Sequence, residues 1–234
     1  MTTFRLLISG QSNSIGFGSG GPEWPVIPEI RFWNNDNDKN NEPDWSVGSS
    51  WEYAECQHLP FRPDGIYQSF GFWFARRYAG FNPEHYVRGL LISRGGTSIT
   101  AWTDGAEPTM RNRIADVWTA SGGSGCDAFL WHQGEKDYAT MPFTEWRDRF
   151  VGLVAWLRST GIIKPDAPVI VGGLARTDAG RIAFNSDLAT FAAANGYGFA
   201  DSAGLPMQGG SLSHFSGDGL KTLGYRYYAE FYGI

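Results

Sequence analysis

Four polar motifs along the chain contain the residue types that transfer of an acyl group requires. Ser12 lies in "SGQSN" near the N-terminus, and His214 lies in "SHFSGDG" near the C-terminus. A serine hydroxyl becomes a nucleophile when a base takes its proton, and histidine is the most frequent base in enzymes. Between them, "SRGGTSITAW" supplies the pair Gly95-Gly96 and "WHQGEKD" supplies Gln133. These residue types predict nucleophilic ester chemistry at Ser12.

Such a reaction passes through a tetrahedral intermediate whose oxyanion needs preorganised hydrogen-bond donors. The candidates are the backbone N–H of Ser12, a backbone N–H from Gly95-Gly96 and the side-chain amide of Gln133. Glycine suits the second position because the backbone must approach the substrate closely. Arg94, beside the glycines, offers a fixed fork of donors suited to a carboxylate on a substrate. An exposed or structurally paired arginine is an equally good interpretation of Arg94.

These motifs can act together only if the fold brings them together. Alternating apolar runs and helix-like segments indicate an α/β fold, a three-layer sandwich with a five-stranded, mainly parallel sheet. In such sheets functional groups gather at the carboxyl ends of strands. The first three motifs directly follow predicted strands, and a loop can bring His214 back over the sheet. The predicted strands are Phe4–Ser9, Val87–Ser93, Ala128–His132, Val169–Val171 and Phe199–Asp201, and the predicted helices cover 67–78, 143–157 and 220–231.

One stretch, 18–63, breaks this alternation. It has little periodicity and many Asn, Asp, Gly, Ser and Pro residues, and we interpret it as a cap-like loop near the site within a single domain over 1–234. The ten tryptophans of the chain have two explanations, an aromatic-rich core or a set of sugar-stacking platforms. Four of them are spread through this stretch, namely Trp24, Trp33, Trp45 and Trp51.

Composition argues against several classes of function. A net charge of −5 disfavours nucleic acid or an anionic membrane as the main partner. No apolar run approaches the ~20 residues of a membrane span, and no signal peptide is evident, so a cytoplasmic or phage-associated location is expected. The four histidines lack paired ligand spacing, so we expect no metal site and no cofactor. Two cysteines, Cys56 and Cys126, argue against a disulfide framework, and Cys126 should pack as a small hydrophobe.

In this order, the four motifs resemble the conserved blocks of the SGNH (GDSL-like) hydrolases, which carry Ser, Gly, Asn and His. "GQSN", "GGTSI" and "QGE" are similar to the sialate O-acetylesterase and acetylxylan esterase branch, where glutamine replaces the asparagine. The resemblance runs from Phe4 to Tyr232 and includes bacterial and prophage-borne esterases. It implies a flavodoxin-like SGNH fold, catalytic Ser12 and His214, and an oxyanion hole of Ser12, Gly96 and Gln133.

The chain departs from that family at one position. The family usually places an aspartate three residues before the catalytic histidine, where this chain has Ser211. A carboxylate there would orient the imidazole and stabilise its cation. Three alternatives follow: a Ser–His dyad with a main-chain carbonyl near Ser211 accepting from the ring, a triad completed by Glu135, or a triad completed by another carboxylate.

We therefore predict a serine esterase that removes O-acetyl groups from a carbohydrate, either a sialic acid or a polysaccharide, through an acetyl-enzyme. A non-catalytic carbohydrate-binding module on the same fold is one alternative, but it should have lost Ser12 or His214. A nucleotide-binding protein would need a glycine-rich loop after the first strand. A lipase-type esterase would need an apolar groove in place of the polar stretch 18–63.

Overall fold

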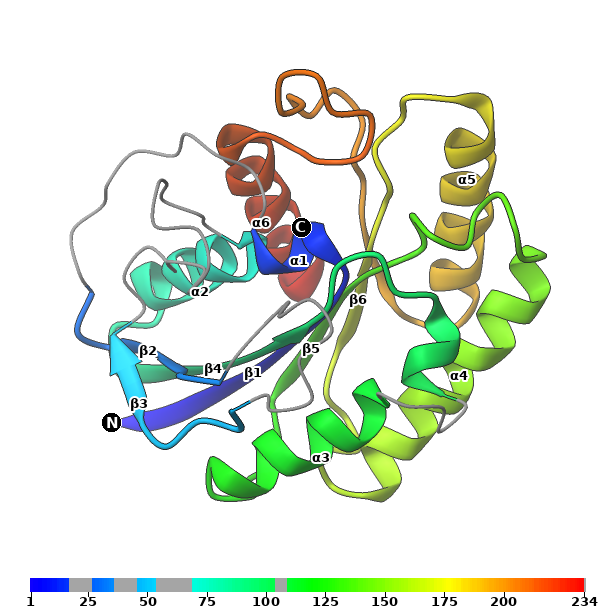
Figure 1. Cartoon of the computed structure of the whole chain (residues 1–234). Helices are drawn as coiled ribbons and strands as arrows, with labels where there is room; N and C mark the ends of the chain where they lie inside the picture. The colour runs from blue at the N-terminus through cyan, green and yellow to red at the C-terminus, as the bar shows by residue number, and fades with distance from the viewer. Residues whose placement is uncertain (17–26, 36–45, 54–68, 104–108, 234) are drawn as a thin grey trace.

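The computed structural model describes residues 1–16, 27–35, 46–53, 69–103 and 109–233. Its centre is a sheet of seven strands in the order β3-β2-β4-β1-β5-β6-β7 (Figure 1). Neighbouring strands are parallel except at the β2–β3 pair, which is antiparallel. The strands are β1 (Thr2–Gly10), β2 (Ile30–Trp33), β3 (Trp51–Tyr53), β4 (His85–Ser93), β5 (Ala128–His132), β6 (Val169–Gly172) and β7 (Gly198–Ala200).

Helices cover both faces of this sheet, as Figure 1 shows. Helices α2 and α6 pack on one face, and α3, α4 and α5 contribute to the core on the other. The described helices are α1 (Ser12–Ile15), α2 (Phe70–Phe81), α3 (Met110–Ala120), α4 (Phe143–Ser159), α5 (Ala179–Ala194) and α6 (Gly217–Tyr232), with the 3₁₀ helix η1 (Ile99–Trp102). None of these helices is long and apolar enough to cross a membrane.

Side-chain alternation along β1 builds the two cores. Leu6 and Ile8 point into the cluster formed with α2 and α6, whereas Leu7 belongs to the cluster formed with α3, α4 and α5. All three side chains are fully buried. Burial of each such side chain contributes about 1.5–3 kcal/mol, so a strand buried on both faces reads as the continuous apolar run seen in the sequence.

The prediction of five strands was wrong, because the sheet has seven. The five predicted strands are present, and the two additional ones, β2 and β3, lie within 18–63. They have four and three residues, too few to show a period of two, and they form one edge of the sheet. Trp33 and Trp51 stack edge-on there, with ring centroids 5.2 Å apart. Residues 18–26, 36–45 and 54–63 of the predicted cap-like loop, with Trp24 and Trp45, lie outside the described residues.

Several aromatic side chains confirm the core interpretation. Trp73, Trp102, Trp131 and Trp146 are among the largest fully buried side chains. Cys126 is also buried, as expected, and burial raises the pKa of its thiol to about 12. Cys56 lies outside the described residues.

The pairing register makes the central strands β1, β4 and β5 end side by side. Strand β1 pairs with β4 and β5, and its last residue, Gly10, lies opposite Ser93 on one side and His132 on the other. The segments that begin at Gln11, Arg94 and Gln133 therefore leave the same edge of the sheet. This edge lies where the chain order changes direction around β1, the usual place for a binding site in an open α/β sheet.

Candidate active site

The turn after β1 is built to place Ser12 directly over the sheet. Gly10 has φ +140°, and a Cβ atom there would lie 2.0 Å from the carbonyl oxygen of His132. This close approach lets the Gln11 N–H donate to the same oxygen at 2.9 Å. Ser12 then begins α1, a single turn that ends at Gly16 in the left-handed conformation. Any residue other than glycine at position 10 would push the nucleophile turn away from β5.

The structure brings the two predicted catalytic side chains together across 202 residues of sequence. Ser12 Oγ lies 2.8 Å from His214 Nε2, within hydrogen-bond range. Ser12 is 9% exposed and His214 is partly exposed, so the pair lies at the surface end of the sheet. This is the geometry in which an imidazole can take the serine proton as the hydroxyl attacks a carbonyl carbon.

Asn13, next to the nucleophile, holds the loop that carries His214. Its amide nitrogen donates to the carbonyl oxygen of Ser213 at 2.9 Å, and its amide oxygen accepts from the N–H of Phe215 at 3.2 Å. These two bonds grip the residues on either side of His214. The residue adjoining the nucleophile thereby contributes to setting the Ser12–His214 distance.

The same loop is also held by its own turn and by α5. The hydroxyl of Ser211 accepts from the backbone N–H groups of His214 at 2.8 Å and Ser213 at 3.1 Å. Arg181, on α5, donates to Ser213 Oγ at 2.8 Å and to the carbonyl oxygen of Leu212. Where the family usually has an aspartate, Ser211 therefore stabilises the turn that presents the histidine.

Glu135 lies beneath this arrangement, almost fully buried. Its carboxylate accepts from Asn13 Nδ2 at 2.8 Å and lies 3.3 Å from His132 Nε2. Burial would raise the pKa of Glu135, but the charge and proximity of His132 and the bond from Asn13 outweigh it, so the pKa lies below its ordinary value. The described contacts of Glu135 thus lead to His214 through Asn13.

Two backbone N–H groups, those of Ser12 and Gly96, remain the predicted oxyanion donors. Ser12 and Gly96 lie on neighbouring segments, and neither N–H has a hydrogen-bond acceptor within the described part of the chain. Gly96 has φ +68°, the left-handed region that favours glycine, and a Cβ atom there would meet open space. The need for glycine at this position is therefore conformational.

Gln133 emerges from β5 as predicted, but it is buried and its amide is already engaged. Its nitrogen donates to the carbonyl oxygen of Thr97 at 3.1 Å and to Asp137 Oδ2 at 2.5 Å. Its oxygen accepts from Trp146 Nε1 at 2.7 Å. Direct donation from Gln133 to an oxyanion remains a prediction and would require one of these bonds to be exchanged.

Arg94 follows β4 directly, beside the oxyanion segment. Its backbone N–H donates to the carbonyl oxygen of Gly10 at 3.0 Å, which ties the β4 exit to the nucleophile turn. The residue is partly exposed. A role for its guanidinium group in holding a sugar carboxylate remains a prediction.

Comparison with known proteins decides the family. A family model described as "carbohydrate esterase, sialic acid-specific acetylesterase" matches residues 4–233. The chain belongs to this family of carbohydrate acetylesterases. The resemblance drawn from the four motifs is thereby confirmed, and the protein is a carbohydrate O-acetylesterase.

Solved structures show the same fold for this acetylesterase. The crystal structure of NanS is 15% identical, with a TM-score of 0.69 over 99% of this chain and 97% of that one. A protein from Arabidopsis thaliana is 20% identical, with a TM-score of 0.69 over 99% and 98% of the two chains. A carbohydrate acetylesterase from Xanthomonas citri is 16% identical, with a TM-score of 0.67 over 99% and 57%. No curated protein sequence matches the chain.

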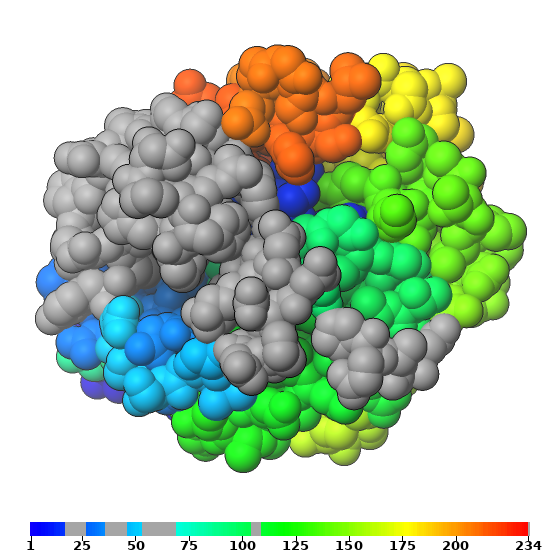
Figure 2. All heavy atoms as spheres, viewed as in Figure 1, coloured from blue at the N-terminus to red at the C-terminus, as the bar shows by residue number. Residues whose placement is uncertain are grey.

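The surface of the acetylesterase is hollowed near these strand ends. Figure 2 shows blue atoms of the N-terminal segment in a depression between the orange loop that precedes α6 and the green segment that follows β4.

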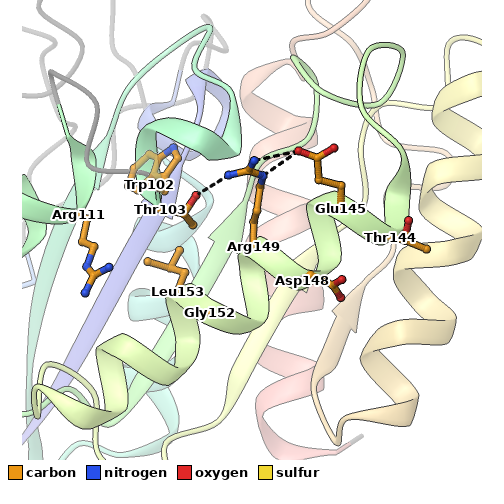
Figure 3. A pocket seen from close by; sticks show the side chains of 9 residues that line it. All are labelled: Trp102, Thr103, Arg111, Thr144, Glu145, Asp148, Arg149, Gly152 and Leu153. Atoms are coloured by element: carbon orange, nitrogen blue, oxygen red, sulfur yellow. Dashed lines mark hydrogen bonds and ion pairs between the residues drawn. The ribbon is translucent and has the colours of Figure 1, made fainter.

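A separate pocket of about 590 Å³ lies where η1 meets α3 and α4 (Figure 3). There Arg149 donates to Thr103 and to Glu145. Among the described residues, no cluster of three or more His, Cys, Asp or Glu side chains could hold a metal ion.

Sequence reasoning missed three residues that hold the site together, namely Asn13, Asp137 and Arg181. The first two lie inside "SGQSN" and "WHQGEKD", so their proximity to Ser12 and Gln133 was the available signal. Arg181 lies on α5 and carries no motif. Its role depends on a contact with a loop more than 30 residues away.

Proposed function

We propose that this acetylesterase hydrolyses acetyl esters of a carbohydrate through a covalent acetyl-Ser12 intermediate. The observation that carries the proposal is the 2.8 Å contact between Ser12 Oγ and His214 Nε2 at the carboxyl ends of the central strands. The family supplies the acetyl-ester class, and the geometry supports these two residues as nucleophile and base.

In the first half-reaction, Ser12 Oγ bonds to the acetyl carbonyl carbon while its proton passes to His214 Nε2. The carbonyl electron pair moves onto oxygen, and the N–H groups of Ser12 and Gly96 stabilise the resulting oxyanion. When the tetrahedral intermediate collapses, the bond to the sugar oxygen breaks. His214 returns the proton to that oxygen, and the sugar leaves as an alcohol.

In the second half-reaction, water replaces the sugar. His214 takes a proton from the water as its oxygen attacks the acetyl carbon, and the same N–H groups stabilise the second oxyanion. Collapse breaks the bond to Ser12 Oγ, which receives the proton from His214, and acetate is released. Glu135 serves both steps by orienting the histidine loop through Asn13.

For the substrate, we propose an O-acetylated sialic acid, bound through its carboxylate by Arg94. The family description and the position of Arg94 at the β4 exit support this choice. A guanidinium fork can bind a carboxylate with two parallel hydrogen bonds, which lysine cannot do.

Acetate release from O-acetylated sialic acids, acetylated xylan and an acetylated bacterial capsule tests the proposal, with Ser12→Ala as the inactive control. We expect sialic acid esters to react fastest. Arg94→Ala should lower kcat/KM for them by about tenfold to a hundredfold, which corresponds to loss of a charged hydrogen bond worth about 1.5–3 kcal/mol. Hydrolysis of a neutral aryl acetate should barely change. Equal losses on both substrates would show that Arg94 is structural, and an absence of acetate release from any carbohydrate would contradict the substrate class.

A further inference from the structure

A buried carboxylate, Asp137, lies behind the oxyanion segment and has no part in the mechanism above. It is 2% exposed and follows Gln133 by four residues in the turns after β5. One of its oxygens, Oδ2, accepts from the backbone N–H of Ile99 at 2.8 Å and from Gln133 Nε2 at 2.5 Å. A buried carboxylate is costly unless it is hydrogen-bonded, so these bonds are what keep the group in place.

Trp146 fixes the orientation of the Gln133 side-chain amide and therefore the direction of these hydrogen bonds. Trp146 Nε1 can only donate, and it donates to Gln133 Oε1 at 2.7 Å. The amide nitrogen of Gln133 must therefore face its two acceptors, Asp137 and the carbonyl oxygen of Thr97. A flipped amide would set two donors against each other at Trp146 and two acceptors against each other at Asp137.

The hydrogen-bond network of Asp137, Gln133 and Trp146 holds the backbone that directly follows Gly96. Gln133 holds the carbonyl oxygen of Thr97, and Asp137 holds the N–H of Ile99, where η1 begins. The hydroxyl of Thr97 turns back to the carbonyl oxygen of Arg94 at 2.8 Å. The carbonyl oxygens of Arg94 and Thr97, which lie on either side of the Gly95-Gly96 pair, are thus both held by hydrogen bonds.

We propose that Asp137 is a positioning residue that, together with Gln133, sets the direction of the Gly96 N–H toward the oxyanion. The inference rests on the proposed role of Gly96 as an oxyanion donor. Asp137 reaches the reaction only through the backbone of Thr97 to Ile99. Loss of its bonds lets Gly96 rotate away from the oxyanion and slows acetylation of Ser12 without altering how the sugar binds.

The test compares three variants on an aryl acetate, with rates expressed per active site. Asp137→Ala removes the acceptor for both donors. Asp137→Asn keeps a neutral acceptor oxygen in the same place. Asn185→Ala is the matched control, because Asn185 is a buried side chain that bonds the backbone N–H and carbonyl oxygen of Leu174 at 2.7 and 2.8 Å, on the segment after β6. Complete labelling with a fluorophosphonate counts competent Ser12 residues, so a partly unfolded variant is corrected for.

We expect Asp137→Ala to lower kcat per labelled site by about tenfold to a hundredfold, as for a small misplacement of a catalytic group, with KM little changed. Asp137→Asn should recover part of this loss, and Asn185→Ala should lower stability while keeping kcat per site. A kcat for Asp137→Ala within twofold of wild type, or a loss no larger than that of Asn185→Ala, would overturn the inference. Wild type no faster than Ser12→Ala would overturn the esterase mechanism itself, and the inference with it.

Discussion

At the scale of single residues, the nucleophile turn rests on a buried charged group. Glu135 and His132 lie 3.3 Å apart below Ser12, and Asn13 joins the carboxylate to the histidine loop. A buried carboxylate is costly unless it is hydrogen-bonded, and the bond from Asn13 stabilises the charged form of Glu135. The local order of the site therefore depends on the ionisation of Glu135.

This dependence gives a prediction about pH. The folded-state pKa of Glu135 lies below its ordinary value of 4.5, so its stabilising contribution is fully present above that value and is lost as pH falls through the folded-state pKa. Glu135→Gln should lower the free energy of unfolding at pH 7 by about 1–3 kcal/mol. The difference from wild type should shrink as the pH falls below 4.5.

Urea unfolding at a series of pH values measures this difference. The control is Glu145→Gln, an exposed carboxylate paired with Arg149 one helical turn away, which should cost about 0.3–0.5 kcal/mol. A difference between Glu135→Gln and wild type that stays constant from pH 7 into the acid range would contradict the pairing described here.

At the scale of elements, the loop between β7 and α6 is held from two directions. Asn13, in the nucleophile turn, and Arg181, on α5, both form hydrogen bonds with this loop. Asn13→Asp should break the first of these attachments, because a carboxylate can accept from Phe215 but faces two other acceptors, Glu135 and the Ser213 carbonyl oxygen. We expect kcat to fall by about tenfold or more, with little change in KM, since the Ser12–His214 contact is what shifts.

Steady-state kinetics on an aryl acetate, normalised to the count of folded molecules, measures this effect. Asn82→Asp provides the control. Asn82 ends α2 at the opposite end of the strands from the site, and its amide nitrogen donates to the carbonyl oxygen of Tyr78. If Asn13→Asp kept wild-type kcat per folded molecule, the loop would be positioned by other contacts.

The elements also show which structural features a single sequence can predict. Buried strands such as β1 and β5 appear as apolar runs because both faces are covered. The bounds of β5 were predicted correctly, whereas the predicted Phe4–Ser9 is the inner part of β1 (Thr2–Gly10). The edge strands β2 and β3 are too short for a periodic signal, so they were missed. Gly10 appeared only as part of a motif, since its close approach to the His132 carbonyl exists only once β1 and β5 pair.

At the scale of the whole molecule, one sheet edge collects residues from both ends of the chain. The motifs predicted that Ser12, Gly96, Gln133 and His214 would meet, and the structure brings Ser12 and His214 into contact. The hydrogen bonds of Gln133 could not be predicted, because its three partners come from separate parts of the chain. They are Thr97 before η1, Asp137 in the turns after β5, and Trp146 on α4. Residue types show which chemistry is available, whereas packing decides which side chains touch substrate and which position others.

The most direct test of the central claim is trapping of the acetyl-enzyme. The protein is mixed with an acetyl ester, quenched in acid within one turnover and digested, and the peptide containing Ser12 is examined by mass spectrometry. We predict one added acetyl group on Ser12 in the wild type, and neither acetylation nor hydrolysis in Ser12→Ala. Retained hydrolysis in Ser12→Ala, or an acetyl group trapped on another residue in the wild type, would contradict the account.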